Sequence, residues 1–354
     1  VPMVLAGLLA WPHTWLEASS GLPVSEDEAP SAPNAIPSWP VALAGTTYYV
    51  APPPLGSNSN SGTDPAHPWA TIQKAADSLG AGDTVYIMTG TYSERVMPLN
   101  SGTPGNYITY VASGTVTIDG SGISLPDDLA GLFEIANKSY IQVSGLRIVN
   151  ARPYLDNAGI LVRNSGHIII EKNTISNTVS SGIGVWGSNN VIIDGNEVVL
   201  ACKDGQQEDI TVAGTNTFEV KNNHVHDGGP GTNGGEGIDA KDGSHDGKIY
   251  KNHVHHLNRL GIYVDAWDKH TYNIEVYQNI VHDSQSDGFT VASEMGGLLE
   301  NIKIHNNIAY HNATLGINIS RNGPVSVPVQ PMKNIQVINN TVYDNGIGTW
   351  GGGI

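Results

Sequence analysis

The densest group of side chains able to do chemistry lies in the decapeptide GGEGIDAKDG, residues 234–243. Its carboxylates, Glu236 and Asp239, together with Glu208 earlier in the chain, are suited to a hard cation such as Ca²⁺, which takes about six to eight oxygen ligands. Lys241 beside that cation would act as a general base if its neighbours lower its pKa. This pattern predicts a calcium site formed by Glu208, Glu236 and Asp239, with Lys241 as the base.

A second chemistry uses the carboxyl groups of Asp265 and Glu294. We expect them to lie about 5–9 Å apart, a separation that suits hydrolysis of a glycosidic bond. In this interpretation Lys241 keeps Asp265 ionised as nucleophile or base, and Glu294 serves as the acid. The two chemistries compete, because an anion beside Lys241 raises the pKa of the lysine and weakens it as a base.

A repeat through most of the chain predicts the elements that position these residues. Short alternating β-rich runs each end in an Asn, and successive Asn residues are 23 to 33 residues apart. Such a repeat is typical of a parallel β-solenoid, in which stacked coils bury a common core. The Asn amides can donate to one coil and accept from the next. The predicted ladder consists of Asn173, Asn196, Asn223, Asn252, Asn279, Asn307 and Asn340.

A second register lies between these runs and predicts which side chains face outward. Its aligned apolar residues, expected to point inward, are Ile160, Ile183, Ile210, Ile238, Ile262, Phe289 and Ile317. Because side chains alternate along a strand and rungs stack about 4.8 Å apart, polar side chains should gather on one face of four or five coils. We expect Lys241 one rung from Asp265, and Glu208 one rung from Glu236. The predicted substrate-binding residues on this face are Trp186, Tyr263, Trp267, Asp287 and Arg321.

The sequence divides into three predicted regions. Residues 1–22 resemble the tail of a secretory signal peptide, and residues 23–45 form a Pro/Ser-rich linker. Residues 46–354 form the β-helix, with an amphipathic helix over about 70–79 covering its first coil. The chain ends in WGGGI without a visible cap, so we expect a truncated C-terminal end that is available for docking. A secreted or cell-surface protein is expected.

Composition limits the partners and the redox chemistry. The formal net charge is −16 and no Lys/Arg-rich run occurs, so nucleic acid and anionic membranes are poor partners. Cys202 is the single cysteine, which excludes an internal disulfide and predicts a packed thiol. Histidines recur three residues after a ladder Asn. We interpret them as a stacked structural column, because ligands in a line do not form a tetrahedron: His226, His255 and His282.

Residues 48–96, beginning YYVAPPPLGSNSNSG, resemble the entry segment of secreted right-handed parallel β-helix proteins, and the coils after it resemble the pectate-lyase-like superfamily. EGIDAK and LGIYVDAWDK resemble consecutive coils of family-nine polysaccharide lyases, which bind Ca²⁺ through Asp residues and use a Lys base. That resemblance places the first Asp ligand on Glu236 and the base near Thr290, so most of that site is absent. GIYVDAW resembles the nucleophile segment of β-helix xylosidases, which places their Asp on Asp265, while Glu294 stands in a shifted position for their acid.

These resemblances predict an all-β, right-handed parallel β-helix that cleaves a polysaccharide in a groove along its length. On superfamily grounds we favour Ca²⁺-assisted β-elimination of a uronate polymer, with glycoside hydrolysis by Asp265 and Glu294 as the alternative. A third interpretation stays open, in which the charges are ordinary surface ion pairs on a carbohydrate-binding or adhesin-like solenoid.

Overall fold

The structure is a computed structural model that describes residues 45–354 apart from 128, 230–233, 322–325, 328 and 348–350. The predicted signal-peptide-like segment, residues 1–22, and all but the last residue of the predicted linker lie outside the described residues. Within the described ranges, no helix combines the length and the apolar character needed to cross a bilayer.

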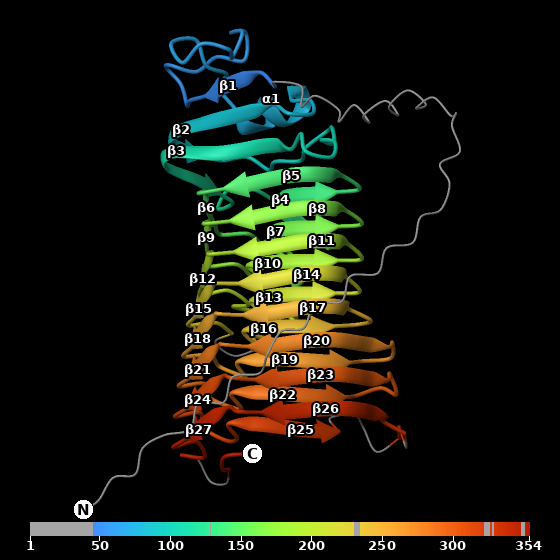
Figure 1. Cartoon of the computed structure of the whole chain (residues 1–354). Coiled ribbons are helices and arrows are strands. Elements are labelled where there is room, and N and C mark those ends of the chain that lie inside the picture. The colour runs from blue at the N-terminus through green and yellow to red at the C-terminus, as the bar shows by residue number, and fades with distance from the viewer. Residues whose placement is uncertain (1–44, 128, 230–233, 322–325, 328, 348–350) are drawn as a thin grey trace, which may run out of the picture. The chain divides into compact units, whose positions relative to one another are not determined.

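The described residues form a parallel β-helix, as predicted, in which each coil from β4 onward adds one strand to each of three stacked columns (Figure 1). One column is a separate eight-stranded sheet: β4 (Gly131–Ala136), β7 (Ala158–Arg163), β10 (Ile183–Trp186), β13 (Ile210–Ala213), β16 (Ile238–Lys241), β19 (Ile262–Ala266), β22 (Phe289–Ser293) and β25 (Ile317–Arg321). We call this sheet the groove sheet.

The other two columns are joined into a second sheet through the long strand β3 (Ile108–Asp119). Its longer strands are β5 (Ser139–Ser144), β8 (Gly166–Glu171), β11 (Asn189–Asp194), β14 (Asn216–Lys221), β17 (His245–Tyr250), β20 (Thr271–Tyr277), β23 (Leu299–His305) and β26 (Met332–Ile338). Its short strands are β6 (Arg147–Val149), β9 (Thr174–Ser176), β12 (Glu197–Val199), β15 (His224–His226), β18 (His253–His255), β21 (Ile280–His282), β24 (Ile308–Tyr310) and β27 (Thr341–Tyr343).

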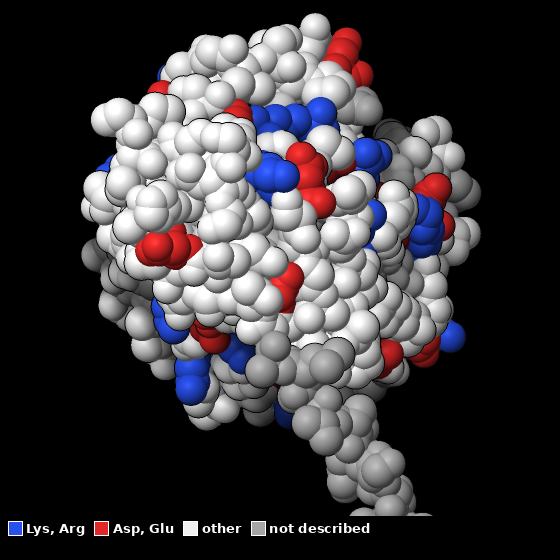
Figure 2. Space-filling view, turned by 90° about the horizontal axis from the view of Figure 1, so that it is seen from above, with Lys and Arg blue, Asp and Glu red and all other residues white. Residues whose placement is uncertain are grey.

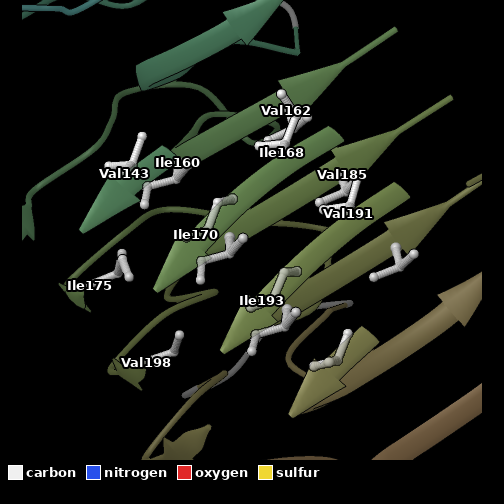
Figure 3. Packing of buried hydrophobic residues seen from close by; sticks show 14 of the residues in the cluster. Val143, Ile160, Val162, Ile168, Ile170, Ile175, Val185, Val191, Ile193 and Val198 are labelled. Carbon is white, nitrogen blue, oxygen red and sulfur yellow. The ribbon is translucent and has the colours of Figure 1, made fainter. Parts of the chain in front are cut away.

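The core is filled by the inward side chains of all three columns. The predicted inward column is confirmed in every pairing from Ile160 to Ile317. Figure 3 shows how Ile160 and Val162 from β7 pack with Ile168 and Ile170 from β8, and with Ile175 from β9. Burying one such side chain contributes about 1.5–3 kcal/mol to the stability of the fold. Burial of this continuous apolar column therefore holds successive coils together.

The predicted Asn ladder is also confirmed and runs through the interior. The Asn223 side chain donates to Asn252 Oδ1 at 3.0 Å and to the Ile193 carbonyl at 3.0 Å, while Asn196 Nδ2 donates to its Oδ1 at 3.0 Å. Residues that precede ladder positions, such as Gly195 and Asn222, adopt positive φ angles of 64° and 54°. Gly and Asn tolerate this conformation, which lets the chain bend sharply before each ladder position.

The two ends of the β-helix differ. At the N-terminal end, β1 (Thr47–Val50) pairs with β2 (Thr84–Tyr92), and helix α1 (Ile72–Ser78) adds Ile72, Ala75 and Ala76 to the core (Figure 1). This helix is shorter than the predicted 70–79 because Thr71 caps it by accepting from the Lys74 amide. At the other end, Ile338 on β26 is 47% exposed. Docking at that end stays a prediction.

On the face of the molecule that is seen from above (Figure 2), charged side chains of both signs are interspersed. Figure 2, the view of Figure 1 turned to be seen from above, shows Lys and Arg in small groups beside Asp and Glu, separated by uncharged surface. The predicted packed thiol is confirmed inside, where Cys202 is fully buried and its thiol donates to the Gln207 carbonyl.

Candidate functional site

A groove of about 530 Å³ lies on the outer face of the groove sheet. It brings together nine of the residues predicted for catalysis and binding, which come from strands or loops of five coils: Trp186, Glu208, Glu236, Asp239, Lys241, Tyr263, Asp265, Trp267 and Glu294. The groove therefore contains all three predicted catalytic residues.

Strand register is what places these side chains together. Thr211 on β13 pairs with Asp239 on β16, and Asp239 pairs with Tyr263 on β19. Asp265 pairs with Ala292 on β22, and Glu294 follows the end of that strand. Since each step of register moves about 4.8 Å along the stack, residues 20 to 30 positions apart in sequence become neighbours in space.

Lys241 is the central cation of the groove. Its Nζ donates to Glu208 Oε1 at 2.6 Å and to Gln207 Oε1 at 3.2 Å, and lies 4.0 Å from Asp239 Oδ2. Burial alone would lower the pKa of Lys241, but the surrounding carboxylates, Glu208 first, outweigh burial and raise it above its ordinary value. Lys241 is thus protonated at neutral pH and pairs with Glu208, whereas the sequence analysis assigned it to Asp265.

Glu236 lies just before β16, on the same coil as Lys241. It is 7% exposed, and Arg259 Nε lies 3.1 Å from its Oε1. Burial and the nearby Glu208 raise the pKa of Glu236 to about 7, against the opposing effect of Arg259. The Glu236 carboxyl group therefore gains or loses its proton near neutral pH.

Two aspartates are the least satisfied polar groups of the site. Asp239 and Asp265 are 1% and 4% exposed, and across the described residues Oδ1 of each has no hydrogen-bond partner. Burial, and then the charge of a neighbouring carboxylate, raises the pKa of both well above the ordinary range; the neighbour is Asp265 for Asp239, and Glu294 for Asp265. A carboxyl group in this state can donate a proton at neutral pH.

Glu294 completes the pair predicted with Asp265. The Tyr263 hydroxyl donates to Glu294 Oε1, and Gln330 Nε2 donates to the Glu294 carbonyl at 2.8 Å, which fixes the loop after β22. Tyr263 is 5% exposed, so its ring is a packed support for Glu294. Glu294 is thereby oriented from one side, beside the carboxyl group of Asp265.

The predicted binding residues separate into two groups. Trp186 and Trp267 line the groove, and Trp267 is 47% exposed, which leaves a ring face free to stack on a sugar. Asp287 instead accepts hydrogen bonds from Thr290 Oγ1 at 3.1 Å and Asn318 Nδ2 at 2.7 Å. Asp287 lines a different hollow, and Arg321 ends β25 at the exposed surface.

The carboxylates predicted to bind calcium do not form a ready-made site. Thr211 and Lys241 each donate a hydrogen bond to one carboxylate oxygen of Glu208, and Arg259 forms an ion pair with Glu236. Among the described residues, no set of three acid or His ligand atoms within 4.8 Å of one another includes these groups. Calcium binding here stays a prediction.

Three groove residues were not found from the sequence. Gln206 and Gln207 directly precede Glu208, and Gln207 accepts from Lys241. Arg259 precedes the aligned segment of the next coil and reaches back to Glu236. Their signal was position: all three lie in the turns before aligned strands, at the same edge of the groove sheet as Glu208 and Glu236.

Residues 101–227 and 130–298 match the family described as "Right handed beta helix region", and together these segments exceed half of the 354 residues. The chain belongs to this right-handed β-helix family. The fold agrees with that of the Dettilon tailspike protein, with a TM-score of 0.51 and 12% identity over 73% of this chain and 52% of that one.

Two curated proteins are similar in sequence. The uncharacterized protein YwoF of Bacillus subtilis is 29% identical over 313 residues, which cover 78% of this chain and 64% of that protein. Pectate lyase PEL9 of Emericella nidulans is 29% identical over 222 residues, which cover 54% of this chain and 50% of that protein. The chain thus spans less than two thirds of the length of both relatives.

Proposed function

We propose that this protein is a carbohydrate-active enzyme that cleaves a polysaccharide lying along the groove sheet. The observation that carries the proposal is the pair Asp265 and Glu294: one carboxyl is buried with an unpartnered oxygen and a raised pKa, and the other is held by Tyr263. The relatives, a pectate lyase among them, support the same class of substrate.

Hydrolysis is the reaction that this geometry supports best. Asp265 holds a proton at neutral pH and would give it to the oxygen of the leaving sugar. Glu294 would act on the opposite side, either on a water molecule or directly on the anomeric carbon. These roles reverse the sequence expectation, in which Asp265 was ionised by Lys241 and Glu294 was the acid, because Lys241 pairs with Glu208.

The remaining groove residues would bind the polysaccharide and exclude water from the groove. Trp267 offers an exposed ring face, and Trp186 lies on an earlier coil of the same groove. Aromatic rings of this kind bury large apolar area and stack on the faces of sugar rings. A polymer following the solenoid axis would contact both tryptophans and pass over the Asp265–Glu294 pair.

β-Elimination of an acidic polymer is the second candidate, favoured by the similarity to pectate lyase PEL9. In that reaction the Lys241 ammonium would neutralise the uronate carboxylate, since its raised pKa makes it a poor base. The C5 proton would pass to a groove carboxylate and the leaving oxygen would take a proton from Asp265. This version replaces the predicted role of Lys241 with that of a charge neutraliser.

The test compares wild type with Asp265→Asn and Glu294→Gln on neutral and uronate polysaccharides. Hydrolysis predicts new reducing ends without unsaturated product, and β-elimination predicts the ultraviolet absorbance of unsaturated uronate. Both variants should lose either activity, while Asp77→Asn on the surface of α1 should retain it. Wild-type activity on no polymer, or full activity of Asp265→Asn, would reject the proposal.

A further inference from the structure

A second cluster of titratable side chains lies on the column of short strands, apart from the groove. In Figure 1 these strands form the narrow stack that runs from β6 to β27. Register aligns His224 on β15 with His253 on β18, and His226 with His255 and then His282 on β21. The middle residue of each strand is a buried Val, so both His positions of β15 and of β18 point outward.

Two parallel columns of imidazoles therefore stand side by side, where the sequence analysis recognised one. Their nitrogen edges meet diagonally: His224 Nε2 lies 2.8 Å from His255 Nε2, and His253 Nε2 lies 2.8 Å from His282 Nε2. One ring nitrogen each of His224, His253 and His255 fall within 4.8 Å of one another. The argument that ligands in a line cannot surround an ion does not apply to this two-column arrangement.

Contacts at the second ring nitrogen hold some of these rings in place. The other ring nitrogen of His255 lies 2.6 Å from His256 Nδ1, and carboxylates bind Nδ1 of His226 and His282 at 2.7 and 2.6 Å. The partner at Nδ1 turns His255 Nε2 toward the cluster, as such partners do behind metal-ligating histidines, while the two carboxylates fix the flanking rings of His226 and His282.

Stacking alone does not account for imidazole at these positions. The column of His226, His255 and His282 continues through Tyr310 and Tyr343 with parallel rings, so a tyrosine supports the stack equally well. Histidine occupies both columns at β15 and β18, whereas at β21 His282 stands beside Ile280. Ring faces explain the stack, whereas converging nitrogen edges require another explanation.

We propose that His224, His253 and His255 form a binding site for a divalent late first-row transition-metal ion such as Zn²⁺. Imidazole nitrogen suits these ions, while Ca²⁺ prefers oxygen. Two nitrogens on one tetrahedral Zn²⁺ at about 2.0–2.1 Å are about 3.3 Å apart, so the 2.8 Å contact needs to open by about half an ångström. Glu197, aligned with His224 and 3.5 Å from His226 Nε2, offers a carboxylate nearby.

The bound ion would join two consecutive coils from outside. His224 belongs to β15, whereas His253 and His255 belong to β18. A ligand that binds the folded state and not the unfolded chain stabilises it by an amount that grows with the logarithm of ligand concentration over Kd, and so raises the midpoint of unfolding. The histidine site lies apart from the groove. We therefore expect a bound ion to change the stability of the fold, and we expect catalysis in the groove not to require it.

The test uses the full chain, purified without a polyhistidine tag and freed of metal with a chelator. Zn²⁺ titrated by calorimetry should bind with one-to-one stoichiometry and raise the thermal midpoint, and Ca²⁺ at the same concentration should do neither at this site. His224→Phe keeps a stacking ring but removes the donor common to both His-containing ligand sets, and should weaken Zn²⁺ binding by at least ~10-fold.

His245→Phe is the matched control. His245 on β17 also stacks on an aromatic ring, that of Tyr272, and also binds a carboxylate, Asp246, through Nδ1. This variant should bind Zn²⁺ as wild type does. The proposal would be overturned if wild type showed neither heat of Zn²⁺ binding nor a rise in its thermal midpoint. Equal Zn²⁺ affinity in His224→Phe and His245→Phe would overturn it as well.

Discussion

The interior Asn ladder and the groove use the same geometric device, polar side chains stacked at rung spacing, with opposite results. In the ladder each amide repeats its neighbour, so Asn196, Asn223 and Asn252 satisfy one another and the backbone. In the groove the residue type changes at each rung, and Asp239 and Asp265 keep an unpartnered oxygen within the described residues. Repetition along a column stabilises the fold, and variation along a column leaves reactive groups available.

The largest expected difference concerns Asp265. Asp265→Asn should lower kcat/KM on the cleaved polymer by about 10²–10⁴-fold, because the protonated carboxyl that serves as acid is removed. The same substitution should leave the free energy of unfolding unchanged or raise it, since an amide carries no ionisation cost in a buried site. Kinetics and urea unfolding at neutral pH check both; a strong loss of stability with retained activity would contradict this contrast.

The ladder should respond in the opposite way. Asn223→Ala removes two hydrogen bonds that its side chain donates, and it removes the oxygen that accepts from the Asn196 backbone N–H and from Asn196 Nδ2, all in the buried interior. We expect a loss of about 2–4 kcal/mol in the free energy of unfolding. Asn216→Ala, where the side chain accepts from Thr217 at 3.4 Å near the surface, should change it by less than about 0.5 kcal/mol. Equal effects would remove the distinction between interior and surface amides.

The proton on Glu236 gives a pH dependence of stability. Its pKa is about 7 in the folded protein and near the ordinary 4.5 when unfolded. Between these values the unfolded chain releases the proton and the folded one keeps it, so the free energy of unfolding falls as pH rises from 4.5 to about 7. We expect a fall of about 1–3 kcal/mol from this group.

Glu236→Gln isolates that contribution. Thermal midpoints measured across the same pH range should fall less steeply in the variant than in wild type, because the glutamine does not titrate. Asp239 and Asp265 act in the same direction, so a residual slope is expected. Identical slopes in the variant and wild type would show that Glu236 ionises at its ordinary pKa.

The smallest stability effect should come from Trp267. Its ring is 47% exposed, so Trp267→Ala should change the free energy of unfolding by less than about 0.5 kcal/mol. If its free face stacks on the polymer, KM should rise by about tenfold, which corresponds to about 1.4 kcal/mol. Unchanged KM in the alanine variant would place the substrate elsewhere along the groove sheet.

The fold could be predicted because its strongest signals repeat. Ile238 and Asn223 each stand in a column of like residues, so alignment of the sequence with itself gave the correct register for both. Register also brought Asp239, Lys241 and Asp265 to one face. These inferences need only strand alternation and rung spacing, and both are properties of the backbone.

Side-chain partners could not be predicted in the same way. The side chain of Lys241 is long and flexible. It contacts Glu208, in the turn before β13 on the preceding coil, instead of Asp265 on the following coil. Asp287 is occupied by Thr290 and Asn318, which no repeat marks as its partners. The second histidine column was missed because only the positions three residues after the ladder Asn were compared. Partner choice depends on side-chain length and burial, which the alignment does not contain.

The most direct test of the central claim is a carboxyl titration of Asp265 by ¹³C NMR, assigned by comparing wild type with Asp265→Asn. The account predicts that the Asp265 carboxyl keeps its proton well above the ordinary range of aspartate, because it is buried beside Glu294. Glu294→Gln should bring that pKa down, since it removes the second cause of the shift. An Asp265 carboxyl that titrates in the ordinary aspartate range would contradict its role as the acid of the groove.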